Sequence, residues 1–145
     1  MTNRTRPSGE PGGVPSGSPT QIEPKDDTET TRGIMRENET AVILASLGYN
    51  VEQRPSVTGR KKPDYQIEGR IFDCYAPITD KAYNIADLIR KKVERGQADR
   101  IVLNLDDSEV DLEELRQQLT SSPIADLQEI VVVKAGKIME FFPEE

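Results

Sequence analysis

The sequence predicts an α/β fold in which a central mixed β-sheet is flanked by helices, in the order α-β-ββ-α-β-α-ββ. Three observations carry this prediction. Apolar stripes at helix spacing alternate along the chain with short apolar runs. The run Arg100-Ile-Val-Leu-Asn-Leu105 is apolar on both faces, which is typical of a central strand covered on both sides. Two pairs of strand-like runs are separated by two-residue turns, at residues 68–69 and 135–136, and so predict hairpins.

The first 32 of the 145 residues differ in composition from the rest of the chain. Eight Pro and Gly residues fall within residues 1–19, apolar side chains are scarce, and a run of Thr, Glu and Asp follows. Such a segment cannot bury enough apolar surface to offset the entropy lost on ordering. We therefore expect residues 1–32 to form a disordered lead or linker, and residues 33–145 to form one small domain.

The first half of the domain is predicted to hold a helix, a short strand and a hairpin. Apolar residues recur at helix spacing over residues 36–47, and Gly48 is a natural helix stop. Residues 49–53 predict a short strand. A polar, basic loop then occupies residues 56–62, and the first hairpin follows and ends near Pro77.

The second half is predicted to hold two helices, a buried strand and a closing hairpin. Residues 84–96 form an amphipathic pattern at helix spacing. The buried strand over 100–105 comes next, followed by a third helix over 111–119 that has capping residues just ahead of it. The closing hairpin joins residues 129–134, which predict a buried strand, to residues 137–142, which predict a strand nearer the sheet edge.

The first hairpin is the most informative feature because it sets two aspartates side by side. If residues 68–69 form a two-residue turn, Asp64 faces Asp73 across the hairpin. Opposed carboxylates with Cβ atoms roughly 5 Å apart destabilise a sheet unless a positive charge lies between them. Two carboxylates with water and a substrate phosphate are what Mg²⁺ favours. The pair therefore predicts a metal site. The alternative is that one or both aspartates cap strand ends and pair with Arg70 or Lys62.

Alternation along the hairpin assigns its side chains to two faces. The face expected to join the core holds Tyr65, Ile67, Phe72 and Cys74. The polar face around the carboxylates holds Asp64, Gln66, Asp73 and Tyr75. Cys74 is the lone cysteine of the chain, which excludes an internal disulfide and a multi-cysteine zinc site, so we expect it to act as a small buried apolar residue.

Two charged residues lie on helix faces that are expected to point inwards. Lys92 lies seven residues after Ile85, within the apolar stripe of its helix, where a lysine either snorkels or serves a site. Glu37 lies seven residues before Leu44, near the expected N-terminus of the first helix, where the helix dipole favours a glutamate without any function. Beside the aspartate pair, Glu37 becomes a candidate third carboxylate, and Lys92 becomes a candidate for stabilising negative charge on a phosphate.

The charged residues constrain the chemistry further. The chain contains no histidine, which excludes Ser-His-Asp and Cys-His catalysis and most transition-metal ligand sets. The net charge of −7 argues against indiscriminate nucleic-acid binding. However, residues 54–100 hold 11 Lys or Arg against 7 Asp or Glu, whereas residues 101–145 hold 3 against 11. A locally basic face suits a protein that grips phosphates, and the alternative is an ordinary solvated face.

No segment carries the signature of a membrane or export element. No stretch approaches the roughly 20 apolar residues of a transmembrane helix, and the N-terminus lacks the apolar core of a signal peptide. We therefore expect a soluble protein whose export would depend on something outside this chain.

Four segments carry a family resemblance, and they are Arg36-Glu-Asn-Glu-Thr40, Gly48-Tyr-Asn-Val-Glu-Gln53, Lys62-Pro-Asp-Tyr-Gln-Ile-Glu-Gly-Arg-Ile-Phe-Asp-Cys-Tyr-Ala-Pro77 and Gly96-Gln-Ala-Asp-Arg-Ile-Val-Leu-Asn-Leu105. They resemble the C-terminal tRNA nuclease domain of CdiA-type contact-dependent growth inhibition toxins, over roughly residues 37–142. Those toxins are similar to the PD-(D/E)XK nuclease superfamily. In that superfamily a central mixed sheet flanked by helices carries a helix glutamate, two strand carboxylates and a lysine.

The resemblance implies roles for individual residues. Asp64 and Asp73 match the two strand carboxylates, and Glu37 matches the helix acid. The residue two after Asp73 is Tyr75 rather than lysine, so Lys92 on the next helix is the candidate for the missing lysine. The resemblance thus implies that Glu37, Asp64, Asp73 and Lys92 are catalytic, and that Asp64 and Asp73 hold Mg²⁺ or Mn²⁺.

The activity implied by the resemblance is that of a metal-dependent endoribonuclease toxin domain, which cleaves tRNA by phosphodiester hydrolysis. Residues Arg60, Lys61, Lys62 and Tyr75 would contact the RNA, whose single-stranded loops and ends are readable. The resemblance also implies delivery into the cytoplasm of a target bacterium and neutralisation by a cognate immunity protein. Two alternatives are a DNA endonuclease of the same superfamily and a non-catalytic, nuclease-like binding module.

Overall fold

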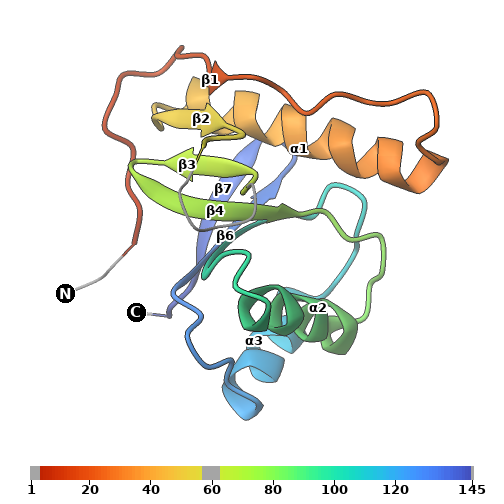
Figure 1. Ribbon diagram of the computed structural model, residues 1–145. Helices are drawn as coiled ribbons and strands as arrows, with labels where there is room; N and C mark the ends of the chain where they lie inside the picture. The colour runs from red at the N-terminus through yellow and green to blue at the C-terminus, as the bar shows by residue number, and fades with distance from the viewer. Residues whose placement is uncertain (1–3, 57–62, 145) are drawn as a thin grey trace.

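The computed structural model describes residues 4–56 and 63–144. Its strands are β1 (Ser16–Gly17), β2 (Val51–Gln53), β3 (Tyr65–Ile67), β4 (Arg70–Tyr75), β5 (Arg100–Asn104), β6 (Glu129–Lys134) and β7 (Lys137–Phe142). Its helices are α1 (Thr28–Ser46), α2 (Ala82–Glu94) and α3 (Leu112–Ser121) (Figure 1). The strands form one mixed sheet in the order β1 to β7. The predicted α/β class and order of elements are confirmed, with β1 added before the first helix.

The sheet is antiparallel at its hairpins and parallel in its middle. Strands β3 and β4 pair antiparallel, as do β6 and β7, whereas β5 pairs parallel with both β4 and β6. The parallel pairs β4–β5 and β5–β6 need crossover connections, and α2 and α3 supply them. The third parallel pair, β1–β2 at the sheet edge, is joined through α1. These crossovers put α2 directly after the hairpin that carries the two aspartates.

Helices cover both faces of the sheet, with α1 on one face and α2 and α3 on the other (Figure 1). Strand β5 shows the alternation. Val102 packs with the α1 core, while Ile101 and Leu103 pack with the core under α2 and α3. All five residues of β5 are buried, which confirms the predicted central strand. None of the helices in the described part of the chain is long and apolar enough to cross a membrane.

The first hairpin has the predicted register. Tyr65 pairs with Phe72, and Ile67 pairs with Arg70. The residues between them are Glu68 with φ 51° and Gly69 with φ 79°, and two positive φ values define a tight hairpin turn that matches the twist of the strands. The turn therefore fixes which residues meet at the open end of the hairpin.

Helix α1 begins at Thr28, eight residues before the predicted start. The Asp27 side chain caps it by accepting a hydrogen bond from the Thr30 backbone N–H. The first half of α1 has no apolar stripe, and ion pairs attach it instead to the loop after β5. Arg32 and Arg36 both bond Asp107, at 2.7 and 2.9 Å, and hydrogen bonds from these arginines lower the pKa of that carboxyl to about 2. Glu37 is therefore mid-helix, and the helix-dipole explanation for it does not apply.

The N-terminal lead differs from the expected disordered linker over residues 1–32. Thr5 is buried, and its backbone N–H and hydroxyl donate to Glu129 at 2.8 and 2.7 Å. Further along, the Gly9 N–H donates to the Gly48 carbonyl at 2.8 Å, and β1 adds to the sheet edge beside β2. The expected boundary between residues 32 and 33 falls inside α1. Composition gave no sign of this because the lead is held by backbone and small polar groups rather than by apolar burial.

Candidate active site

The predicted site residues converge at the open end of the first hairpin. Glu37 from α1, Asp64 just before β3, Asp73 from β4 and Lys92 from α2 line one cleft of about 400 Å³. Tyr75, a predicted nucleic-acid contact, lines the same cleft. A single cavity thus receives side chains from α1, from the first hairpin and from α2, which lie far apart in the sequence.

Backbone hydrogen bonds tie the two aspartates to each other's strands. The Asp64 N–H donates to Asp73 Oδ1 at 3.3 Å, and the Cys74 N–H donates to Asp64 Oδ2 at 2.8 Å. The hairpin therefore brings Asp64 and Asp73 together as its turn predicted. Carboxylates held in this way on strands keep their positions better than carboxylates on a loop.

Lys92 supplies a positive charge to one member of the pair. Its Nζ lies 3.1 Å from Asp73 Oδ2, and the two side chains are 19% and 8% exposed. Among the described residues, no Lys or Arg nitrogen lies within 4.0 Å of the Asp64 carboxylate. Arg70, an alternative partner predicted for the aspartates, instead donates to Thr5 at the turn end of the hairpin. The other, Lys62, lies outside the described residues.

The environment of the cleft raises the pKa of Asp64 and of Glu37. Burial, together with the charges of Asp73 and Glu37, raises the pKa of Asp64 to about 8. Burial also raises the pKa of Glu37, and the hydrogen bond from Thr20 opposes this shift. Such a group of acids is stabilised by a proton or a cation, and strongly shifted pKa values in a cleft are typical of functional sites.

We expect Asp64→Asn to stabilise the metal-free protein at pH 8 but not at pH 4. Folding raises the pKa of Asp64 from 3.8 to about 8. At pH 4 the carboxyl is largely protonated in the folded protein and costs little stability. As the pH rises from 3.8 towards 8, the free energy of unfolding falls, because the unfolded chain loses this proton more readily than the folded protein does. The gain at pH 8 should be at least about 1.4 kcal/mol, the value of one pKa unit. Urea unfolding in chelator at both pH values measures it. An equal effect at pH 4 and pH 8 would contradict the prediction.

Glu37 is held from two sides. The Thr20 hydroxyl donates to Glu37 Oε2, and the Tyr65 hydroxyl donates to the backbone carbonyl of Glu37. A second cavity of about 340 Å³ lies against Glu37 and Asp64 and is also lined by Thr20 and Arg54. Sequence reasoning missed Thr20 because it lies in the lead, where no local pattern marks a contact with the site.

Arg32 and Gln97 also line the cleft and were not predicted to belong to the site. Arg32 lies before the predicted domain boundary, and Gln97 lies in the loop after α2, within a segment that carries the family resemblance but was given no role in the site. Arg32 Nη2 also donates to the Ala76 carbonyl at 2.7 Å, which joins α1 to the end of β4. The remaining predicted nucleic-acid contacts, residues 60–62, lie outside the described residues.

The donor set suits a hard divalent cation. Asp64 and Asp73 offer carboxylate oxygens that retain free lone pairs beyond the hydrogen bonds described above. Over residues 4–56 and 63–144, no group of three or more His, Cys, Asp or Glu side chains is arranged to hold a metal ion. The two aspartates would therefore need water and substrate oxygens to complete a shell, as Mg²⁺ commonly does.

Comparisons with known proteins agree on one family. The family model of the contact-dependent growth inhibition CdiA C-terminal domain matches residues 61–138, a range that holds Asp64, Asp73 and Lys92. The "tRNA nuclease CdiA-2" of Burkholderia pseudomallei (strain 1026b) is 47% identical over 139 residues, which are 95% of this chain. The chain spans only 4% of the length of that relative.

A solved structure shows the same fold. It is the CdiA-CT/CdiI toxin and immunity complex from Burkholderia pseudomallei, one chain of which matches with a TM-score of 0.82 and 48% identity. The match covers 88% of this chain and 97% of that chain. The mixed sheet and its helices are therefore shared over nearly the whole of the matched relative.

Proposed function

Because this chain belongs to the family of contact-dependent growth inhibition CdiA C-terminal domains, we propose that it is a toxin domain that cleaves tRNA by metal-dependent phosphodiester hydrolysis. The observation that carries the proposal is the convergence of Asp64, Asp73 and Lys92 in one cleft. The fold and the nuclease class are supported by the relatives, and the choice of tRNA rests on the name of one of them.

The chemistry follows from the charges in the cleft. Asp64 and Asp73 would hold Mg²⁺ or Mn²⁺, which when bound would polarise the phosphate and lower the pKa of an attacking water. Lys92, whose Nζ already lies 3.1 Å from Asp73, would stabilise the charge that develops on the phosphate oxygens as water adds and the phosphorus–oxygen bond to the leaving group breaks. Glu37, which lines the same cleft as Asp64, would orient the attacking water.

The four residues support a place in the PD-(D/E)XK superfamily, which is part of the proposal. A helix acid, two strand carboxylates and a lysine make up the set, here Glu37, Asp64, Asp73 and Lys92. The departure is that the lysine comes from α2 instead of from β4, where Tyr75 occupies the expected position. The contact between Lys92 and Asp73 supports the view that the lysine comes from a different element but still lies beside the strand carboxylates.

A protein partner is the second part of the proposal. The solved relative was determined as a toxin and immunity complex. By this similarity we expect the present chain to bind a cognate immunity protein and to act in the cytoplasm of a target bacterium. Tyr75 and the basic residues Arg60, Lys61 and Lys62 are proposed to contact the RNA.

Removal of divalent metal is expected to abolish cleavage of tRNA. Purified protein is incubated with total bacterial tRNA in Mg²⁺ or Mn²⁺, in chelator, and in chelator with metal restored. We expect discrete fragments with metal and a loss of more than about a hundredfold in rate without it, because a metal Lewis acid is worth several kcal/mol. Duplex and single-stranded DNA are tested in parallel.

Other results would contradict parts of the proposal. Cleavage of DNA with intact tRNA would contradict tRNA as the substrate and favour a DNA endonuclease. Cleavage that persists in chelator would contradict the dependence on a divalent metal. Intact tRNA and DNA in every condition would leave a nuclease-like binding module.

A further inference from the structure

The N-terminal lead follows a defined path to the second cavity, beside Glu37. Ser16 and Gly17 pair in parallel with Glu52 and Gln53 at the edge of the sheet, and the chain then runs alongside α1 before turning into it (Figure 1). A segment with the composition of a linker therefore ends beside the helix that carries Glu37.

The backbone of Thr20 is held by one asparagine. The Thr20 N–H donates to Asn38 Oδ1 at 2.9 Å, and Asn38 Nδ2 donates to the Thr20 carbonyl at 2.9 Å. The Asn38 side-chain amide thus forms hydrogen bonds with both the N–H and the carbonyl of Thr20, as a neighbouring strand would. The buried Gln53 side chain steadies that amide, because its Nε2 donates to Asn38 Oδ1 at 3.0 Å.

With its backbone held, Thr20 directs its hydroxyl at a side chain on the neighbouring helix. That side chain is Glu37, whose Oε2 accepts the hydrogen bond. We propose that Thr20 is a positioning residue, whose hydroxyl holds the Glu37 carboxylate near Asp64. The lead brings Thr20 to the second cavity, which shares Glu37 and Asp64 with the cleft. This inference rests on the proposed function, since it assigns Thr20 to the nuclease site.

Gly17 makes this path possible. Its φ of +75° is one that glycine adopts more readily than other residues, and a Cβ atom there would lie 2.1 Å from the backbone oxygen of Gln53. The backbones of Gly17 and Gln53 cannot move apart without breaking the pairing of β1 with β2. An alanine at residue 17 would therefore push the lead away from the sheet without altering any group that touches Glu37.

The experiment compares Thr20→Val, Thr20→Ser and Gly17→Ala with the unaltered protein in tRNA cleavage at saturating metal. Loss of a hydrogen bond to a charged group predicts that Thr20→Val lowers kcat about tenfold to a hundredfold, with KM unchanged within about twofold. Thr20→Ser should restore kcat to within about threefold, and Gly17→Ala should lower it in the same direction as valine. Urea unfolding of all four proteins separates these effects from global stability.

Two outcomes would overturn the inference. One is an equal loss of kcat in the serine and valine variants, and the other is full kcat in Thr20→Val. Crystal structures of the unaltered protein and Thr20→Val supply a readout that does not depend on activity. If the protein cleaves neither tRNA nor DNA, the proposed function fails. The positioning role then stands if the Glu37 carboxylate leaves Asp64 in the valine variant, and it fails if the carboxylate stays.

Discussion

Replacing Asp73 with asparagine is expected to lower the rate of tRNA cleavage by about a hundredfold to a thousandfold, with the fold retained. Asparagine keeps the shape of the side chain and an oxygen that can accept the Asp64 N–H. It removes the negative charge that pairs with Lys92 and that we propose binds the metal. The loss should appear in kcat, because both interactions act on the charge of the transition state.

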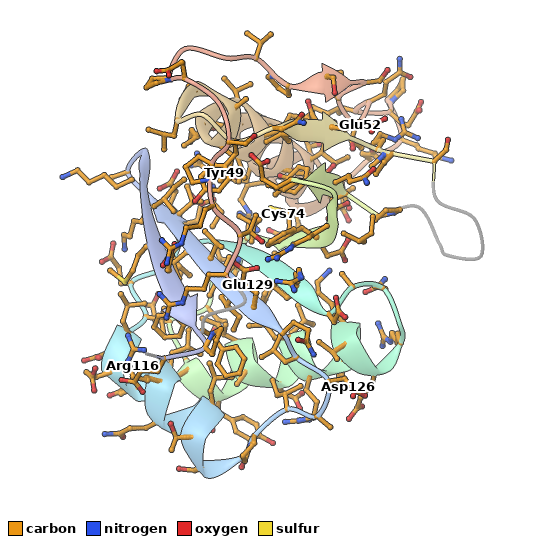
Figure 2. The ribbon with its side chains drawn as sticks, turned by 90° about the vertical axis from the view of Figure 1, so that its left-hand side faces the viewer. Tyr49, Glu52, Cys74, Arg116, Asp126 and Glu129 are labelled. Carbon is orange, nitrogen blue, oxygen red and sulfur yellow. The ribbon has the colours of Figure 1, made fainter. Side chains whose placement is uncertain are left out.

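A matched control is Asp126→Asn. Asp126 lies in the loop between α3 and β6, apart from Cys74 in Figure 2, and it does not line the cleft. Its φ of 71° also suits asparagine, so this variant should cleave at the unaltered rate. Single-turnover cleavage and urea unfolding of both variants make the comparison. A rate for Asp73→Asn within about tenfold of the unaltered protein would show that the aspartate pair does not carry the chemistry.

Replacing Glu129 with leucine is expected to lower the free energy of unfolding by about 3–5 kcal/mol, because it removes one partner from a buried ion pair. Glu129 is 1% exposed at the start of β6, and it is labelled in Figure 2. It accepts hydrogen bonds from the buried Arg100 and from the N–H and hydroxyl of Thr5. The substitution therefore removes the carboxylate from a buried guanidinium and also loosens the start of the lead.

Glu113→Leu provides the same change at an exposed ion pair. Glu113 is 76% exposed and lies 3.5 Å from Arg116, and such pairs contribute little to stability. We expect a change within about 1 kcal/mol there. Urea unfolding of both variants and of the unaltered protein gives the two changes in the free energy of unfolding. The slopes of the transitions are compared to check that they are alike. A loss below about 1 kcal/mol for Glu129→Leu would mean that Arg100 and Thr5 gain most of their stabilisation elsewhere.

The strands and the aspartate pair could be predicted from the sequence because their determinants are local. A two-residue turn at Glu68 and Gly69 fixes the register of its hairpin, and a register fixes which side chains meet. Asp64 and Asp73 thus came together from spacing alone. The closing hairpin matched its predicted bounds, residues 129–134 and 137–142, for the same reason.

The position of Lys92 was only partly predictable. Its place in the apolar stripe of α2 indicated that it points inwards, but a stripe does not say which element it meets. The crossover from β4 through α2 to β5 lays this helix beside the hairpin and brings Nζ within 3.1 Å of Asp73. The local sequence therefore indicates the direction of the Lys92 side chain, whereas only the tertiary structure shows that its partner is Asp73.

The sequence by itself determined that a mixed sheet forms, the order of its elements along the chain from α1 onwards, and the two aspartates of the cleft. Each of these follows from apolar periodicity or from a two-residue turn. Only the tertiary structure decided that the lead is part of the domain and that Thr20 reaches Glu37. Thr5 meets an acceptor 124 residues away, and Thr20 meets one 17 residues away. Hydrogen bonds from small polar residues to distant partners leave no periodic apolar pattern, so a chain segment that they hold has the composition of a linker.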